Sequence, residues 1–137
     1  MIKRIVWVAP VLIAIACVPL FAQRKRLPDL KVRQFEFVPR NDKAVRVQVA
    51  NYGSVNAGSS VLRLTVRKIK GISVGRTIDA NVSALAPGKG DWVLIDCTSI
   101  LPKDVALKNT TFKLNVDATN LVTESNEANN ETWHNGP

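Results

Sequence analysis

The sequence has few of the residues on which catalytic and metal centres most often depend. Its 137 residues include two cysteines and one histidine. Cys17 lies inside an apolar N-terminal stretch, so Cys97 is left without a disulfide partner, and the alternating run before it predicts a buried thiol. His134 lies near the C-terminal end, where chains usually fray. No His/Cys cluster, serine–histidine–aspartate set or glycine-rich phosphate loop is present, so we predict that the protein is not an enzyme and uses no cofactor.

Aromatic residues are also scarce, at 6% of the chain, although the formal net charge is +8. Proteins that bind single-stranded nucleic acid interleave basic residues with aromatic side chains on which bases stack. Here the basic residues are scattered along alternating apolar segments, which disfavours nucleic acid as a partner and favours a solvated basic surface. An anionic polymer of the cell surface remains open as an alternative partner.

The first 22 residues have the pattern of a secretory signal peptide. Lys3 and Arg4 precede an uncharged apolar stretch, and Ala22 suits the last position before cleavage. We therefore predict a signal peptide at 1–22, a basic linker at 23–28 and an exported domain at 29–137. The linker's charges oppose translocation, so an uncleaved anchor is the second interpretation and lipidation of Cys17 the third. The protein would be held at a membrane only if residues 5–22 are retained or Cys17 is lipidated.

Alternation of polar and apolar residues dominates the rest of the chain and predicts an all-β domain. The clearest strands lie around residues 45–49, 62–66 and 112–116, where every second side chain is apolar. About seven short strands, separated by turn signals, predict an antiparallel β-sandwich whose strand order the sequence does not reveal. No segment has the period and length of a helix.

Two further features concern individual strands. Leu30 and Val32 alternate in one phase, whereas Phe35 and Phe37 alternate in the opposite phase. Because successive side chains point to opposite faces of a sheet, this change predicts a β-bulge near residues 33–34 or a strand that crosses between sheets.

Trp92, in the apolar run that ends at Cys97, is expected to pack in the core.

Carboxylates and carboxamides crowd residues 117–130. We predict an exposed polar turn there, joining the last two strands, because Asp, Glu and Asn are rarely buried without partners. A paired general acid and base at Glu124 and Glu127 is disfavoured, since an exposed turn provides no burial to separate their pKa values. Calcium binding is a minor alternative. Its candidate ligands are Asp117, Asn120, Glu124 and Glu127.

The calcium alternative does not fit the EF-hand template. A loop starting at Asp117 would need ligands at Thr119 and Leu121 and a glycine at Val122, and it has none of them. Turn chemistry explains the same residues, because short polar side chains satisfy the backbone of a loop.

Several short segments of the sequence occur in the same order as the motifs of a known family. They are Pro28-Asp29-Leu30, residues 47–53, Ala57-Gly58, residues 85–88, and the acidic stretch at 117–130. The sequence resembles the CARDB family, the cell adhesion related domain found in bacteria. Its most specific signature is the turn made by Asp117, Asn120, Glu124, Asn126, Glu127, Asn129 and Asn130.

The resemblance implies an immunoglobulin-like sandwich that works as a non-catalytic module at the cell surface. We therefore expect an exported binding or adhesion module of the bacterial envelope, whose partner is an unidentified envelope or extracellular protein. An unpaired sheet edge is the suggested contact. The alternative is an envelope module that binds Ca²⁺ through the acidic turn or an anionic polymer through a basic face.

Overall fold

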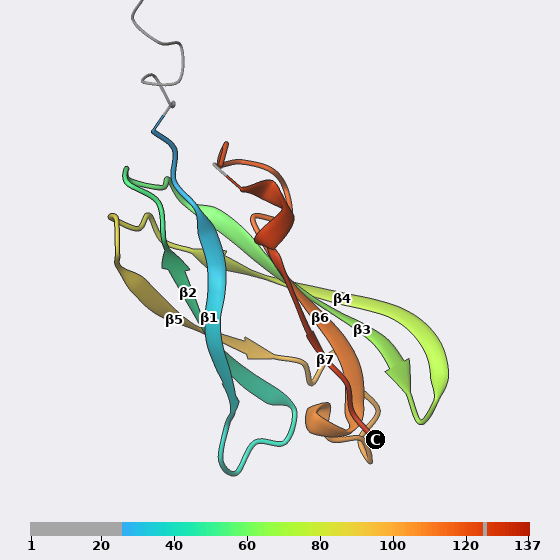
Figure 1. The fold of residues 1–137 in the computed structure, drawn as a ribbon. Helices are drawn as coiled ribbons and strands as arrows, with labels where there is room; N and C mark the ends of the chain where they lie inside the picture. Colours follow the sequence, from blue (N-terminus) through green and yellow to red (C-terminus); the bar gives the residue numbers. More distant parts are fainter. Residues whose placement is uncertain (1–25, 125) are drawn as a thin grey trace, which may run out of the picture.

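The computed structural model describes residues 26–124 and 126–137. They form seven strands in two antiparallel sheets, as predicted (Figure 1). The strands are β1 (Leu30–Phe37), β2 (Ala44–Asn51), β3 (Ser60–Ile69), β4 (Ile72–Val82), β5 (Gly90–Asp96), β6 (Thr110–Val116) and β7 (Glu131–His134). Two short 3-10 helices are described, η2 (Leu107–Asn109) and η3 (Glu127–Asn129). The predicted signal peptide and the first half of the predicted linker, residues 23–25, lie outside the described residues.

Strand order within the two sheets is β1-β2-β5 and β4-β3-β6-β7. All pairings are antiparallel, so β1 and β5 form the edges of the first sheet, and β4 and β7 those of the second. No helix of the described residues has the length and apolar character needed to span a membrane.

The core lies between the sheets and follows the alternation seen in the sequence. Val45, Val47 and Val49 of β2 are fully buried and face the second sheet's apolar residues. Leu64 of β3 and Leu114 of β6, which are register partners, are equally buried. Burial of these side chains is the main source of stability, because no disulfide is available among the described residues.

The predicted bulge in β1 is present. The register with β2 shifts between Val32 and Gln34. The extra residue restores the inward direction, so that Leu30 at the start of β1 and Phe35 near its end both face the core. A second bulge, which the sequence did not indicate, lies between Val66 and Lys68 of β3.

An aromatic cluster closes one end of the sandwich. The ring of Phe112 lies 5.8 Å from Phe35, 6.2 Å from Phe37 and 4.9 Å from His134, measured between centroids. His134 therefore belongs to β7 and packs on the core, where the sequence had suggested a frayed tail. Its Nε2 lies 2.9 Å from the carbonyl oxygen of Lys108.

Trp92 does not pack in the core, contrary to the prediction. It is the register partner of Gln48 and shares the outer face of its sheet with the exposed Leu94. The ring lies under the guanidinium of Arg46, with 4.8 Å between Cζ and the ring centroid. Cys97, by contrast, is fully buried as predicted, and burial raises the pKa of its thiol to about 12.

Candidate functional site

The acidic stretch joins β6 to β7, as predicted, at the opposite end of the sandwich from the aromatic cluster (Figure 1). Asp117 and Asn120 have φ angles of 52° and 53°. Asp and Asn tolerate this left-handed region better than other side chains do. The Asp117 carboxylate accepts hydrogen bonds from the backbone N–H groups of Leu121 and Val122 at 2.9 and 3.1 Å, which folds the loop around it.

The second half of the loop is organised by Glu124, Glu127 and two asparagines. Asn126 caps η3 by accepting a hydrogen bond from the N–H of Ala128 at 3.1 Å. The Glu127 carboxylate accepts from the N–H of Glu124 at 2.8 Å. Asn130 then donates its amide to Glu124 at 3.0 Å and to Glu127 at 3.4 Å.

Burial of this loop corrects the prediction of an exposed turn. Asp117, Glu124 and Asn130 are only 2%, 5% and 6% exposed. Glu124 reaches the first strand, where its carboxylate accepts a hydrogen bond from the backbone N–H of Leu30. Its partners make the burial of a carboxylate tolerable, since a buried polar group without them would be costly.

The electrostatic consequence is a raised pKa for Glu124. Burial is the main cause and lifts the pKa from 4.5 to about 7, with smaller contributions from the negative charges of Glu127 and Asp117. The hydrogen bonds from Leu30 and Asn130 act in the opposite direction. The expectation that no carboxylate of this turn is desolvated was therefore wrong for Glu124.

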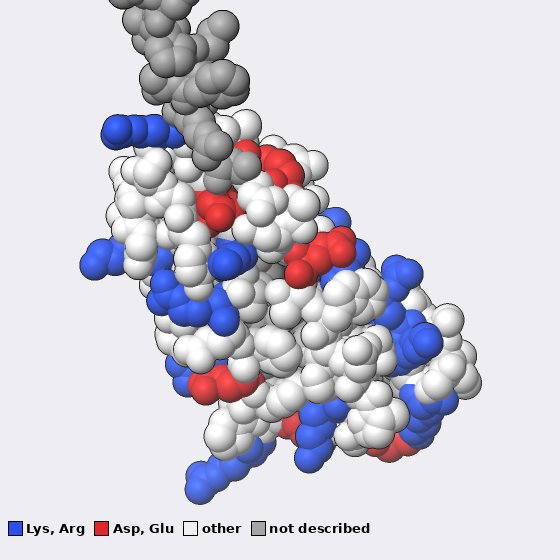
Figure 2. Space-filling view, in the orientation of Figure 1, with Lys and Arg blue, Asp and Glu red and all other residues white. Residues whose placement is uncertain are grey.

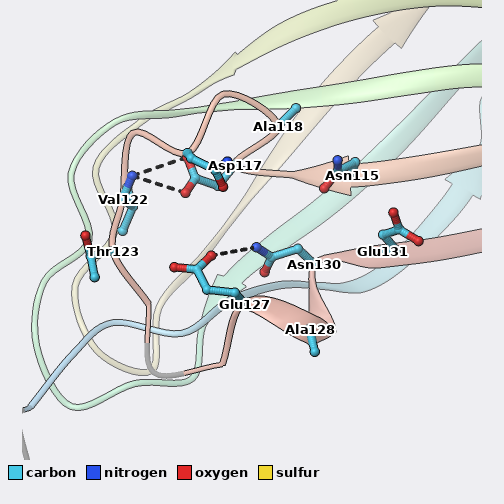
Figure 3. Close-up of a pocket in the computed structure, with 10 residues that line it drawn as sticks. Asn115, Asp117, Ala118, Val122, Thr123, Glu127, Ala128, Asn130 and Glu131 are labelled. Carbon is cyan, nitrogen blue, oxygen red and sulfur yellow. Dashed lines mark hydrogen bonds between the residues drawn. The ribbon is translucent and has the colours of Figure 1, made fainter.

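Three carboxylates of the loop converge. Asp117, Glu124 and Glu127 each offer one oxygen, and these oxygens lie within 4.8 Å of one another. Asp117 and Glu127 line an open pocket of about 580 Å³, which Asn120 and Asn130 also line (Figure 3). Its lining includes no lysine or arginine. Of the four candidate calcium ligands, the structure thus brings the three carboxylates together, and the fourth, Asn120, lines the same pocket as Asp117 and Glu127.

Two buried amide oxygens of this loop, Oδ1 of Asn129 and Oδ1 of Asn130, have no hydrogen-bond partner among the described residues. The Nδ2 of Asn130 points at Glu127, so the Oδ1 of Asn130 is turned away from that carboxylate (Figure 3). Carboxylate and amide oxygens are the ligands that hard cations such as Ca²⁺ take. Acid–base chemistry has less support, because Glu124, whose pKa is shifted, is absent from the pocket lining and already accepts two hydrogen bonds.

The other segments that carry the family resemblance lie beside the acidic loop and are joined to it through Asp29. Asn129 donates its amide to the carboxylate of Asp29 at 2.8 Å. The side chain of Asn51, fully buried at the end of β2, accepts from the N–H groups of Asp29 and Gly53. A Cβ at Gly53 would lie 2.5 Å from the carbonyl oxygen of Leu27, so only glycine fits there.

Asn51 is a buried centre of hydrogen bonds, a role that the sequence did not indicate. Its amide also donates to the carbonyls of Val55 at 2.7 Å and Leu85 at 3.1 Å. The segments that carry the family resemblance therefore converge at this polar end of the sandwich and tie together loops far apart in the sequence.

Comparison with known families agrees with this arrangement. The CARDB family matches residues 27–134, which include every strand. The chain belongs to the CARDB family. This family is an adhesion-related domain of cell-surface proteins. A comparison with curated protein sequences finds no significant match.

Two solved CARDB-like structures are similar to this chain. A solution structure of a domain from a candidate cell surface protein of Methanosarcina acetivorans is 26% identical, with a TM-score of 0.59 over 81% of this chain and 93% of that one. A crystal structure of the CARDB domain of a Pyrococcus furiosus protein, in complex with di-metal ions, is 23% identical. Its TM-score is 0.56, over 80% of this CARDB chain and 91% of that chain. At 23% identity, the similarity to the Pyrococcus furiosus domain shows that the two chains share a fold.

Proposed function

We propose that the protein is an exported, non-catalytic binding or adhesion module of the bacterial envelope that contacts a partner protein along the edge strand β4. Membership of the adhesion-related CARDB family and the similarity to a candidate cell surface protein support the location. The observation that carries the edge contact is the length and exposure of β4, which spans 11 residues and pairs only with β3.

The four edge strands differ in how well they could accept a further strand. β7 has four residues, β5 has seven, and β1 is interrupted by its bulge. Bulges and short edges discourage pairing with another chain. β4 also carries an irregularity, where residues 74 and 75 lie opposite Arg67 of β3. It contains no proline, however, and most of its 11 residues are exposed, so its backbone is the longest available template for β-augmentation.

A pair of proline variants tests the edge contact. Neighbouring N–H groups of an antiparallel strand point alternately toward and away from the paired strand. Of Arg76→Pro and Thr77→Pro, one therefore removes an N–H that faces β3 and the other removes one that faces the free edge. The variant that removes the N–H facing the free edge should keep the melting temperature of the wild-type protein. The same variant should no longer capture the proteins that the wild-type chain captures from the envelope fraction. Arg76→Ala, which keeps the backbone N–H, is the control, and unchanged capture by both proline variants would contradict the proposal.

A second candidate function is the binding of Ca²⁺ at the acidic loop. The convergence of three carboxylates, with no lysine or arginine among the residues that line the pocket, supports it. The Pyrococcus CARDB domain, which was crystallised with di-metal ions, adds support by analogy. Each carboxylate also has hydrogen bonds within the protein, so the loop can fold without an ion.

Thermal melting in Ca²⁺ and then in a chelator tests this second function. Ca²⁺ should raise the melting temperature, and Glu127→Gln, which keeps the acceptor for the Glu124 N–H, should abolish the increase. Glu131→Gln is the matched control, because Glu131 lines the same pocket but lies outside the carboxylate cluster. An unchanged melting temperature in both solutions would remove calcium from consideration.

A further inference from the structure

The outer face of the three-stranded sheet carries a group of basic and aromatic side chains that the sequence did not reveal. We name it the cation–aromatic face and define it by Lys31, Arg33, Arg46, Gln48, Tyr52 and Trp92. These residues come from β1, β2, β5 and the turn that follows β2. Figure 2 shows basic side chains over the part of the molecule that β1 and β2 form.

At one end of this face, two cations surround Tyr52, which is 45% exposed. The Lys31 ammonium lies 4.2 Å from the ring centroid, and Cζ of Arg33 lies 5.4 Å from it. Arg33 also donates its Nε–H to the tyrosine hydroxyl at 3.1 Å. Neither cation forms an ion pair with a carboxylate among the described residues.

At the other end, Arg46 lies over Trp92 with 4.8 Å between Cζ and the ring centroid. One of its nitrogens is 3.0 Å from the Glu36 carboxylate. Gln48 lies between the two groups, opposite Trp92 in the register with β5, and its Oε1 accepts a hydrogen bond from Gln34 at 3.0 Å. Lys31 pairs with Ala50, four residues from Arg46. The two cationic groups are therefore separated by about 13 Å along the strands, at the usual rise of about 3.3 Å per residue.

The geometry favours an extended anion. Cations that rest on aromatic rings are held in place before a ligand arrives, which lowers the entropy lost on binding. On the outer face of the four-stranded sheet, Arg63 is paired with Asp79, and Lys113 lies over Trp133 and is paired with Glu131. The cation–aromatic face differs because two of its three cations, Lys31 and Arg33, lie beside an aromatic ring without a carboxylate partner among the described residues.

We propose that this face binds an acidic polysaccharide, with ammonium and guanidinium groups on its carboxylates and the Gln48 amide on its hydroxyls. Guanidinium groups suit carboxylates, and amides both donate to and accept from hydroxyls. A single-stranded nucleic acid fits less well, because its bases would need aromatic faces that the cations already cover. The inference assumes the envelope location proposed above but is independent of the β4 contact and of calcium.

The test is affinity electrophoresis of the full chain in gels that contain polygalacturonate, with neutral dextran as the reference. Wild-type protein should be retarded by the polyuronate and not by dextran. The triple variant Lys31→Gln, Arg33→Gln and Arg46→Gln should bind at least about tenfold more weakly, which corresponds to the loss of a few exposed ionic contacts.

A charge-matched variant decides whether the face itself matters. Arg67→Gln, Lys68→Gln and Lys103→Gln remove the same charge from exposed residues outside the face and should bind as wild type does. Equal weakening in both triple variants would overturn the proposal, because net charge alone would then explain binding. Equal affinity for single-stranded DNA would also overturn it. Loss of the β4-dependent capture, with polyuronate binding intact, would separate this inference from the edge contact.

Discussion

The two ends of the sandwich hold the same strand by different means. At the polar end, Leu30 at the start of β1 is fixed by a hydrogen bond to the buried carboxylate of Glu124. At the aromatic end, Phe35 and Phe37 at the close of β1 pack edge-on against Phe112. Apolar packing is non-directional and scales with area, whereas a buried polar group is costly as soon as one partner is lost. The stability of the polar end should therefore depend on individual hydrogen-bonding atoms, whereas the stability of the aromatic end should depend on the buried side-chain volume.

The largest effect is expected at the aromatic end. Phe112→Ala should lower the free energy of unfolding by about 3–5 kcal/mol, since it removes a fully buried ring and leaves a cavity. Urea denaturation followed by fluorescence measures this change. Phe112→Leu, which keeps most of the volume, should cost clearly less. A similar loss in both variants would mean that ring contacts, and not volume, hold this end.

At the polar end, Glu124→Ala should lower the free energy of unfolding by about 1–3 kcal/mol, because the N–H of Leu30 and the amide of Asn130 lose their acceptor. Glu124→Gln keeps one acceptor oxygen and should cost less at neutral pH. Urea denaturation of both variants gives the comparison. If the alanine and glutamine variants were equally stable, the hydrogen bond to β1 would not contribute and the proposed difference between the ends would fail.

The strands were predictable because their evidence is local. Val45, Val47 and Val49 alternate with polar residues, and the change of phase between Val32 and Phe35 is visible in a few neighbouring positions. Burial of Glu124 was not predictable in this way. Its partner Leu30 is 94 residues away, and nothing near Glu124 in the sequence distinguishes a carboxylate that caps a distant strand from one in solvent.

The same limit applies to Trp92 and His134. Alternation places Trp92 on one face of β5 but does not say which face is covered, because Val93 and Leu94 are both apolar. His134 is close to the chain end, and only its pairing with Phe112 in β6 brings it into the aromatic cluster. At the site, composition identified the acidic residues, whereas the convergence of three of them depends on the path of the loop.

The pH dependence of stability should distinguish the ends further. The folded-state pKa of Glu124 is raised from 4.5 to about 7, so the folded protein binds this proton more tightly than the unfolded chain does. The resulting stabilisation is complete below pH 4.5 and is lost as the pH rises through about 7. As the pH rises from 4.5 to about 7, the free energy of unfolding of the wild-type protein should therefore fall relative to that of Glu124→Gln. Urea titrations at several pH values would measure this difference.

The difference in the free energy of unfolding between wild type and Glu124→Gln does not contain the contribution of the other acidic residues, because both proteins share them. The pKa of Asp79 is lowered by its hydrogen bonds with Arg63, and that of Asp96 by those with Thr98, so both should reduce stability only at more acidic pH. A difference that stays constant from pH 4.5 to 8 would show that Glu124 does not titrate as its burial implies. The aromatic variant Phe112→Leu should show the wild-type dependence, because it leaves the polar end intact.

The smallest effect is expected for the outermost contact of the polar end, between Asn129 and Asp29. Asn129→Ala should cost about 0.5–1.5 kcal/mol, because the bond from its amide to the Asp29 carboxylate is only partly buried. A double-mutant cycle with Asp29→Ala isolates this bond from other effects of each substitution. Coupling should be measurable for this pair and absent for Asn129→Ala combined with Phe112→Leu, which lies at the other end. Significant coupling in the second pair would mean that the two ends do not act independently on β1.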